Sequence, residues 1–384
     1  MVFMCYERRN GLTFPFGYAI ICKNIDYNKR ELVMTIYYIL LFCSALIFSL
    51  QFLITKQYQR YNGTGFLSSV RLSFFAYITI ALFFFIKGCI TTQSFNFGFS
   101  WFTLFMTLLI AVVSLSNVYM GIKVLSVGDM SIYSMFMMLG SLILPSFVGL
   151  IFYQEELTLI KGIALACMFI AILLSVSGAD KTKVSVKALL YYIGVFVMNG
   201  LIGVLFTVHQ NQAGLTAAAI LNADGSFSVN NDVFMTWYGL STVLLCGGVY
   251  LVNVIIQKVK TAKPIALENS VKTEQIQASD EIVGERVEIS KNGQNKAKNK
   301  AILTLFITIG LSALYGLCNG LGDYFIALAT QPHALGSSVT FPIINGGTIV
   351  FSTIIGAVMY KEKIKPITIV SLVMVIVSTI LFML

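Results

Sequence analysis

The chain has 384 residues, of which 57% are hydrophobic and only 11% charged, and its formal net charge is +9. Soluble domains contain roughly 45–50% apolar and about 25% charged residues, so this composition excludes an ordinary soluble protein and indicates an integral membrane protein. The basic residues lie mostly between hydrophobic segments, as membrane topology requires, so the positive charge does not call for a nucleic-acid partner.

Residues 1–33 precede the first long apolar segment and are basic. The apolar stretch from Gly11 to Cys22 is too short to span a bilayer and lacks a small-residue cleavage site, so we expect neither an extra helix nor a signal peptide. Lys29-Arg30-Glu31 stands just upstream of Met34, as a translated bacterial ribosome-binding site would. The natural chain either begins at Met34, with 1–33 untranslated, or carries a disordered basic leader.

Ten apolar segments are long enough to cross a hydrocarbon core about 30 Å thick, which takes about 20 helical residues. In chain order they are 34–55, 66–86, 102–122, 128–152, 159–178, 186–208, 233–256, 302–328, 336–359 and 366–384. Continuous apolar runs differ from the alternating strands of a membrane barrel, and backbone in lipid must satisfy its own hydrogen bonds. The sequence therefore predicts an all-α integral membrane protein with ten transmembrane helices.

The segment 257–299 is the one long polar stretch between these helices. It is rich in Lys, Glu, Gln and Ser and poor in aromatic residues, which is typical of a flexible linker. Most Lys and Arg residues follow odd-numbered helices, whereas the loops after even-numbered helices hold only Lys87 and Lys161. The positive-inside rule then places the 257–299 loop in the cytoplasm and both termini outside. We expect a multi-pass protein of a bacterial plasma (inner) membrane.

The chain also contains an internal repeat. At one constant offset, five residues of one segment recur in another: Ser131, Gly140, Gly149, Tyr153 and Glu155 return as Ser338, Gly347, Gly356, Tyr360 and Glu362. The two halves, 34–178 and 179–384, are therefore predicted to be copies of one five-helix unit. Because five is odd, the second copy enters the membrane inverted, an architecture that recurs in secondary transporters.

Each half has a glycine-containing fourth helix, a short acidic hinge, reading QEELT and then KEKIK, and a closing aliphatic helix. In these features the chain resembles the drug/metabolite transporter superfamily of the EamA type, and the resemblance covers all ten helices. It implies a secondary transporter, not driven by ATP, that moves a small metabolite or drug-like solute by alternating access. It also implies a cavity lined by helices 1–4 and 6–9, with helices 5 and 10 peripheral. The substrate is not defined by the resemblance.

Polar residues inside the predicted helices are few, and each is a candidate for binding a substrate or a coupling ion. Asp323 is the one carboxylate well inside a predicted helix, and intramembrane ionisable residues are functional hypotheses by default. Asn319 lies four residues earlier, on the same helix face. Asp323 and His209, at the outer end of 186–208, could bind a proton or a cationic group, or both could be solvated helix-end residues.

Four further polar residues could either line a cavity or form hydrogen bonds between packed helices: Asn345, Asn117, Asn199 and Gln51. Pro342, Gly346 and Gly347 predict a break in helix 336–359, where free backbone groups would face a ligand, with close small-residue packing as the alternative. Glu155 and Glu362 lie in the hinges, and we expect them to be structural, accepting bonds at the starts of the following helices.

The seven cysteines show no metal-ligand spacing and the chain has only two histidines, so we expect no metal, no cofactor and no catalytic residue. The expected partners are a small-molecule substrate and the lipid bilayer, with a proton or a sodium ion as the alternatives for a coupling ion; a homodimer is left open. Since fold does not fix function, a transport-inactive receptor or scaffold is the alternative. A membrane-embedded enzyme is disfavoured because clustered carboxylates or histidines are lacking.

Overall fold

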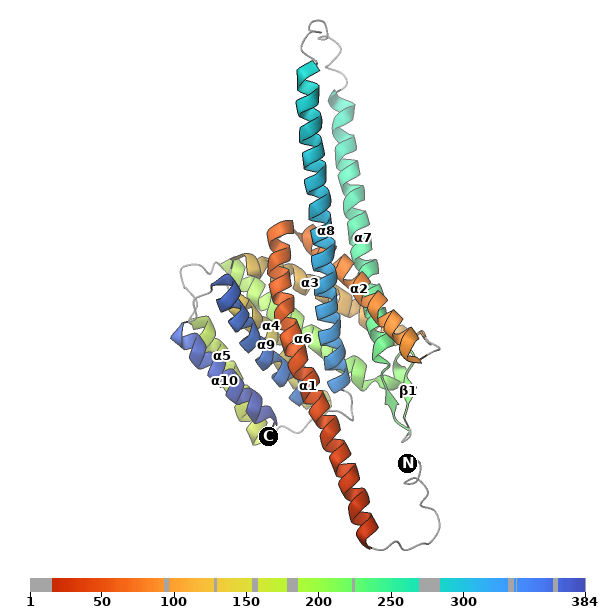
Figure 1. Ribbon diagram of the computed structural model, residues 1–384, viewed down its shortest axis with the longest axis vertical. Helices are drawn as coiled ribbons and strands as arrows, with labels where there is room; N and C mark the ends of the chain where they lie inside the picture. Colours follow the sequence, from red (N-terminus) through yellow and green to blue (C-terminus); the bar gives the residue numbers. More distant parts are fainter. Residues whose placement is uncertain are drawn as a thin grey trace.

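The computed structural model describes residues 16–92, 97–127, 130–153, 158–177, 186–222, 225–268, 284–330, 335, 337–361 and 365–383. These residues form ten α-helices, which correspond one to one with the ten predicted segments (Figure 1). In chain order they are α1 (Phe16–Asn62), α2 (Phe66–Thr92), α3 (Trp101–Val127), α4 (Met130–Phe152), α5 (Leu159–Ser177), α6 (Val186–Asn211), α7 (Asn231–Glu268), α8 (Gly284–Ala329), α9 (Ser337–Tyr360) and α10 (Pro366–Met383).

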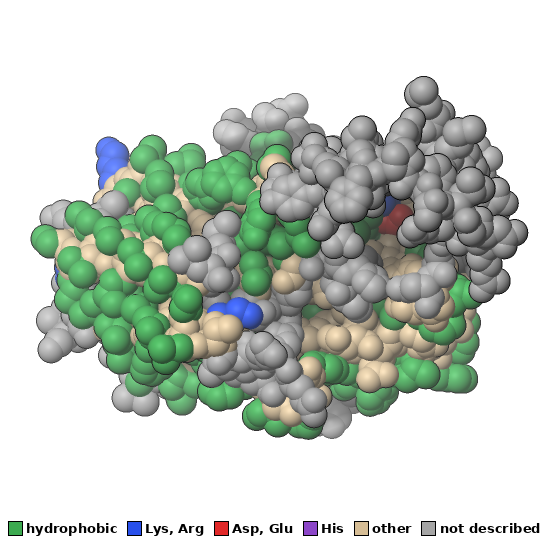
Figure 2. All heavy atoms as spheres, turned by 90° about the horizontal axis from the view of Figure 1, so that it is seen from below, with side chains coloured by type: hydrophobic (Ala, Val, Ile, Leu, Met, Phe, Trp, Pro, Cys, Tyr) green, Lys and Arg blue, Asp and Glu red, His purple; other side chains and the backbone are tan. Residues whose placement is uncertain are grey.

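Eight of the described helices, α1–α4 and α6–α9, are long and apolar enough to cross a membrane. The described side chains of α5 and α10 cover shorter apolar stretches, Leu159–Ala171 and Pro366–Leu381. Large apolar side chains are exposed on the outside, Leu159 at 82% and Trp101 at 77%, and hydrophobic side chains spread widely over the described surface in Figure 2. A surface of this kind needs lipid around it, so the chain is a multi-pass helical membrane protein.

A short irregular segment joins α6 to α7. It contains a 3-10 turn, η1 (Ala213–Leu215), and a hairpin of β1 (Ile220–Leu221) and β2 (Phe227–Ser228), in which Ile220 pairs with Ser228. Thr103 Oγ1 of α3 accepts a hydrogen bond from the backbone N–H of Ala217 at 2.9 Å. The segment is thus tied to the end of the helical bundle.

Three helices run more than ten residues beyond their predicted spans. α7 continues to Glu268 and α8 starts at Gly284, so the segment expected to be a flexible linker is helical over 257–268 and 284–299, and both helices project from the same end of the bundle (Figure 1). Likewise α1 reaches back to Phe16, into the leader for which no helix was expected. Lys, Glu, Gln and Ala are good helix formers, and extending an existing helix avoids the cost of nucleation.

The two halves of the chain are interleaved and do not form separate domains. α1 packs against α8 and α9, while α6 packs against α3 and α4. α2 packs against α8 and α7 against α3, and the pairs α2–α7, α4–α9 and α5–α10 join the halves directly. A Cβ atom at Gly140 would overlap the carbonyl of Phe196, so the α4 and α6 backbones nearly touch.

The predicted break in the ninth helix is absent, because α9 is continuous through Pro342, Gly346 and Gly347. Pro342 lies in the second turn, where its missing N–H removes only one bond close to the helix start. A Cβ atom at Gly346 would collide with Thr379 of α10, and one at Gly347 would lie 2.8 Å from the Cβ of Ala45 in α1. The glycine pair therefore serves close helix packing.

Candidate functional site

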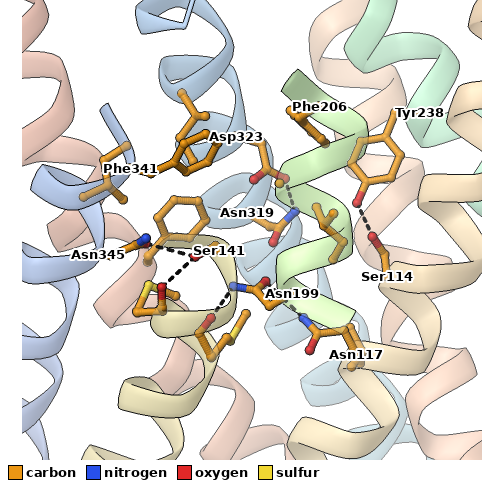
Figure 3. Close-up of a pocket in the computed structure, with 18 of the residues that line it drawn as sticks. Ser114, Asn117, Ser141, Asn199, Phe206, Tyr238, Asn319, Asp323, Phe341 and Asn345 are labelled. Carbon is orange, nitrogen blue, oxygen red and sulfur yellow. Dashed lines mark hydrogen bonds between the residues drawn. The ribbon is translucent and has the colours of Figure 1, made fainter. Parts of the chain in front are cut away.

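A cavity lies inside the bundle, and its described lining comes from α1–α4 and α6–α9, with no residue from α5 or α10 (Figure 3). The cavity offers a volume of about 70 Å³ to the centres of water molecules. One water needs roughly 10–15 Å³ of such space, so the cavity has room for several waters or a small solute. Its polar lining residues are Tyr77, Ser114, Asn117, Ser141, Asn199, Tyr238, Tyr315, Asn319, Asp323 and Asn345.

Asp323 is held by a chain of amides that runs from α8 to α1. Its Oδ2 accepts a hydrogen bond from Asn319 Nδ2 at 2.7 Å, and Asn319 Oδ1 accepts one from Gln51 Nε2 at 2.9 Å. When the carboxylate is ionised it can only accept, so the N–H side of Asn319 faces Asp323 and its oxygen faces Gln51. Gln51 is 2% exposed and does not line the cavity, so it positions Asn319 from behind.

Asp323 is the one charged residue among the cavity-lining residues that the structure describes, and no Lys, Arg or His accompanies it there. Its side chain is half-buried. A carboxylate removed from water costs several kcal/mol unless a partner compensates it. The charge of Asp323 is therefore compensated by a proton, by water in the cavity, or by an ion or a solute that enters it.

A second set of amides lies across the cavity, on α3, α4 and α6. Asn199 Nδ2 donates to the carbonyl of Met137 at 2.7 Å, which fixes the orientation of that amide, and Asn199 Oδ1 then accepts from Asn117 Nδ2 at 3.4 Å. The remaining atom of Asn117, Oδ1, is buried and has no hydrogen-bond partner. Asn117, a lining residue, thus keeps one buried acceptor without a hydrogen-bond partner.

Asn345 of α9 is in a comparable position. Its Oδ1 lies 3.1 Å from Ser141 Oγ, which also lies 3.0 Å from the carbonyl of Met138, and its Nδ2 has no partner. Turning the amide over would let Nδ2 donate to Ser141 but would leave Oδ1 unpaired instead. In either orientation Asn345, which is 3% exposed, keeps one unpaired polar atom at the cavity.

Phenol groups form a third part of the lining. Tyr238 Oη lies 2.6 Å from Tyr77 Oη and 2.6 Å from Ser114 Oγ, so this chain of three hydroxyls joins α2, α7 and α3. Two hydrogen bonds use two of the three hydroxyl protons, so one of the three hydroxyls keeps a proton to donate. The remaining aromatic lining residues are Phe48, Phe206, Tyr315 and Phe341.

Outside the cavity, polar clusters join helices at opposite ends of the bundle. In the first, which we call the ion-pair clamp, Lys87 Nζ lies 2.6 and 2.9 Å from the carboxylate oxygens of Asp232 and 2.9 Å from the hydroxyl of Tyr324. In the second, the tyrosine clamp, Lys56 Nζ and the guanidinium of Arg60 lie 4.0 and 5.0 Å from the ring centroid of Tyr360. The ion-pair clamp connects α2, α7 and α8, and the tyrosine clamp connects α1 and α9.

The structure brings five of the predicted site residues into the cavity wall, Asp323, Asn319, Asn345, Asn117 and Asn199, with Gln51 behind them. It separates His209 from the group. His209 is fully buried between the rings of Phe102 and Phe234, with centroids 5.7 and 4.2 Å away, and its Nε2 lies 3.3 Å from Thr103 Oγ1. His209, a candidate for binding a proton or a cationic group, is therefore not among the residues that line the cavity with Asp323. Glu155 and Glu362 lie outside the described residues.

Sequence reasoning missed the hydroxyl and aromatic part of the lining. One signal was present: Tyr315, Asn319 and Asp323 are spaced four residues apart and so form one stripe along α8. Ser114 and Asn117 likewise share a face of α3. Ser141 and Tyr238 have no other polar lining residue three or four positions away on their helices, so only tertiary packing places them in the cavity wall.

No protein-family model matches the chain, and no curated protein sequence matches it. Chains of solved structures do match. One of them, titled only "Crystal structure of protein", is 11% identical, with 88% of this chain and 94% of that chain covered at a TM-score of 0.48. This likeness carries no argument about family or function. Among the residues that the structure describes, no group of three or more His, Cys, Asp and Glu side chains could hold a metal ion.

Proposed function

We propose that this chain is a secondary transporter of the drug/metabolite type, which moves a small solute across the membrane by alternating access. The observation that carries the proposal is the interior polar cavity with its uncompensated carboxylate, Asp323, inside a bundle of membrane helices. Such a group is expensive in a membrane and is kept where a substrate or an ion needs it. Secondary transporters place their substrate site in this way, between two repeats.

Helix packing supports an inverted repeat. If each helix of the first half is exchanged with the one five places later, α1–α8 becomes α6–α3, α1–α9 becomes α6–α4, and α2–α8 becomes α7–α3, all of which are observed contacts. The pairs α2–α7, α4–α9 and α5–α10 are exchanged with themselves. This is the pattern expected for two units related by a two-fold axis, and the odd number of helices in each unit places that axis in the membrane plane.

Two hydrogen bonds between α5 and α10 support the same axis at the level of single residues. Ser371 Oγ donates to the carbonyl of Ala171, and Ser378 Oγ donates to that of Ala164. Ser371 and Ser378 follow Ala164 and Ala171 at the same offset that relates Ser131 to Ser338. Exchanging the halves therefore converts one residue pair into the other.

The clamps at the two ends supply the gates that alternating access requires. Opening toward the side where α2 ends would separate Lys87 from Asp232 and Tyr324. Opening toward the other side would separate α1 from α9 and with them Lys56 from Tyr360. We assign the ion-pair clamp to the outer face and the tyrosine clamp to the cytoplasmic face of a bacterial inner membrane, because the basic loops follow the odd-numbered helices.

The test begins with a thermal-shift screen of the purified protein against amino acids, sugars, nucleosides and amines, because a ligand of the native state raises the unfolding temperature. Each hit is then tested for counterflow in proteoliposomes without ATP. A transporter exchanges external labelled hit for internal unlabelled hit. Consumption of the hit would identify an enzyme, and binding without exchange would identify a receptor or scaffold; either result would contradict the proposal.

A further inference from the structure

We infer that the cavity recognises a small organic monocation, an amine whose ammonium group binds Asp323, and that it rejects zwitterions and anions. The inference rests on the proposed function in one respect, that the cavity is the substrate site. It goes further by assigning a charge class to the ligand.

The charge of the lining gives the first argument. Asp323 is its one charged residue among the described positions, and a lone carboxylate attracts cations while it repels anions. An amino acid would place its ammonium group at Asp323 but would bring a carboxylate with it. That carboxylate would find no Lys, Arg or His in the described lining, and burying an unpaired charge is strongly unfavourable.

The hydrogen bonds around Asp323 argue against a bare metal ion. Ions such as Ca²⁺ and Mg²⁺ take six or more oxygen ligands. Asn319 presents its N–H to the carboxylate, and its oxygen is already bonded to Gln51. The group beside Asp323 therefore donates a hydrogen bond and offers no oxygen to a metal, whereas an ammonium group needs only acceptors and apolar contact.

The aromatic lining supplies that contact. Phe206 and Phe341 line the cavity together with Asp323, and they flank it in the view of Figure 3. The faces of aromatic rings attract ammonium groups, most strongly where water is excluded. A cavity lined by a carboxylate and by aromatic rings fits a substituted ammonium group better than a strongly hydrated ion.

The rest of the polar lining is neutral, since it consists of amides and hydroxyl groups. Such groups do not carry the opposite charge that a second charged group on the ligand would need. Beyond its ammonium group the ligand is therefore uncharged.

The experiment uses ligands matched in shape and different in charge. One set is 2-phenylethylamine, phenylalanine and 3-phenylpropionate; the second is isoamylamine, leucine and 4-methylpentanoate. We expect the amine of at least one set to raise the unfolding temperature of the purified wild-type protein at a concentration at least tenfold below that needed by its zwitterionic and anionic partners. If neither amine is preferred in this way, the inference is wrong.

Variants then test whether Asp323 causes the preference for the amine. Asp323→Asn should abolish the preference for the amine, while Asp323→Glu should retain it. Glu288→Gln is the matched control, because it removes an acid from the same helix, in the part of α8 that projects beyond the bundle (Figure 1), and should leave the preference unchanged. A preference that survives Asp323→Asn would overturn the inference. Should Asp323→Asn fail to fold, the comparison within each ligand set in the wild-type protein still decides.

The binding and counterflow experiments together distinguish a failure of this inference from a failure of the proposed transport function. Amine binding that depends on Asp323, without counterflow, would leave the inference standing and contradict the proposed transport function. Counterflow of leucine or phenylalanine, with no binding of the corresponding amine, would leave the transport function standing and overturn the inference.

Discussion

At the scale of single residues, the cavity depends on a few small side chains that let helices approach. Gly316 of α8 lies against α2, where a Cβ atom would overlap the backbone carbonyl of Ala76. The same helix carries Asp323 and Asn319 into the cavity wall. The close contact at Gly316 therefore sets how far these polar groups stand from their partners on other helices.

We expect Gly316→Ala to destabilise the protein by about 1–3 kcal/mol, because a backbone carbonyl cannot move aside as a flexible side chain can. Gly310→Ala is the matched control, since it lies on the same helix with nothing within 4 Å of the added Cβ atom. There the gain in helix propensity should make the change neutral or slightly stabilising. Thermal unfolding in detergent measures both, and equal shifts would contradict the packing argument.

Two asparagine side chains in the cavity wall, Asn199 and Asn117, are held in fixed orientations by hydrogen bonds. The carbonyl of Met137 fixes Asn199, and Asn199 in turn fixes Asn117. Removing the Asn199 amide should leave the buried amide of Asn117 without its partner, while the Met137 carbonyl would keep only its bond within α4. The cost of such losses is about 1–3 kcal/mol for each buried group.

Accordingly, Asn199→Ala should lower stability by more than Ser116→Ala, whose hydroxyl is exposed and bonds only within its own helix. It should also weaken binding of any cavity ligand, because Asn117 would lose its fixed orientation. Titration of the ligand found by thermal shift measures the second effect. Unchanged affinity and stability in Asn199→Ala would show that the amide pair has no organising role.

At the scale of elements, the ion-pair clamp joins α2, α7 and α8 next to the cavity, since Tyr324 follows Asp323 directly. The side chains of Lys87 and Asp232 are 33% and 13% exposed, so the pair lies between the surface and buried classes. Surface pairs contribute about 0–1 kcal/mol, and buried pairs mainly penalise the loss of one partner. We therefore treat the clamp as a switchable contact with a modest contribution to stability.

Lys87→Met and Asp232→Asn should each open the outer gate, which would raise the rate of labelling of a cysteine introduced at Ser114. The reversed pair, Lys87→Asp with Asp232→Lys, should restore much of the wild-type rate because the attraction is re-formed. The double-mutant coupling is expected to be on the order of 1 kcal/mol. If the reversed pair labels as fast as the single variants, the ion pair is not the gate.

At the scale of the whole molecule, the proposed two-fold axis passes between α5 and α10. Two cysteine pairs test it in a cysteine-free background: Ala171 with Ser371, and Ala164 with Ser378. Both pairs should form disulfides on mild oxidation to a similar extent, because exchanging the halves interconverts them. The mixed pair Ala164 with Ser371 should not cross-link. Efficient cross-linking of only one of the two pairs would argue against the axis.

Sidedness is the second test at this scale. Cysteines introduced at Ser290, in the projecting part of α8, and at Gln212, between α6 and α7, should react differently with an impermeant reagent in intact cells. The distribution of Lys and Arg predicts labelling at Gln212 and protection at Ser290. The opposite result would mean that the whole bundle is inverted in the membrane.

The sequence alone determined the medium of the protein, the number and positions of its apolar helices, and the placement of Asn319 and Asp323 on one face of α8. These properties depend on local sums of hydropathy and on the helical period, which need no knowledge of neighbouring helices. The recurrence of Gly140, Tyr153 and Glu155 as Gly347, Tyr360 and Glu362 is likewise visible in the sequence alone. For the cavity, the sequence indicated five of the residues in its wall and one behind them: Asp323, Asn319, Asn345, Asn117 and Asn199, with Gln51 behind.

Only the tertiary structure decided which helices meet. It placed His209 between phenylalanine rings away from Asp323, kept α9 continuous through Pro342, and continued α7 and α8 as helices into the polar segment between them. It also brought Ser141 to Asn345 and Tyr77 to Tyr238, residues far apart in the chain. These outcomes depend on close packing between helices from both halves, and a packing free energy between distant segments has no signature in the sequence of either segment alone.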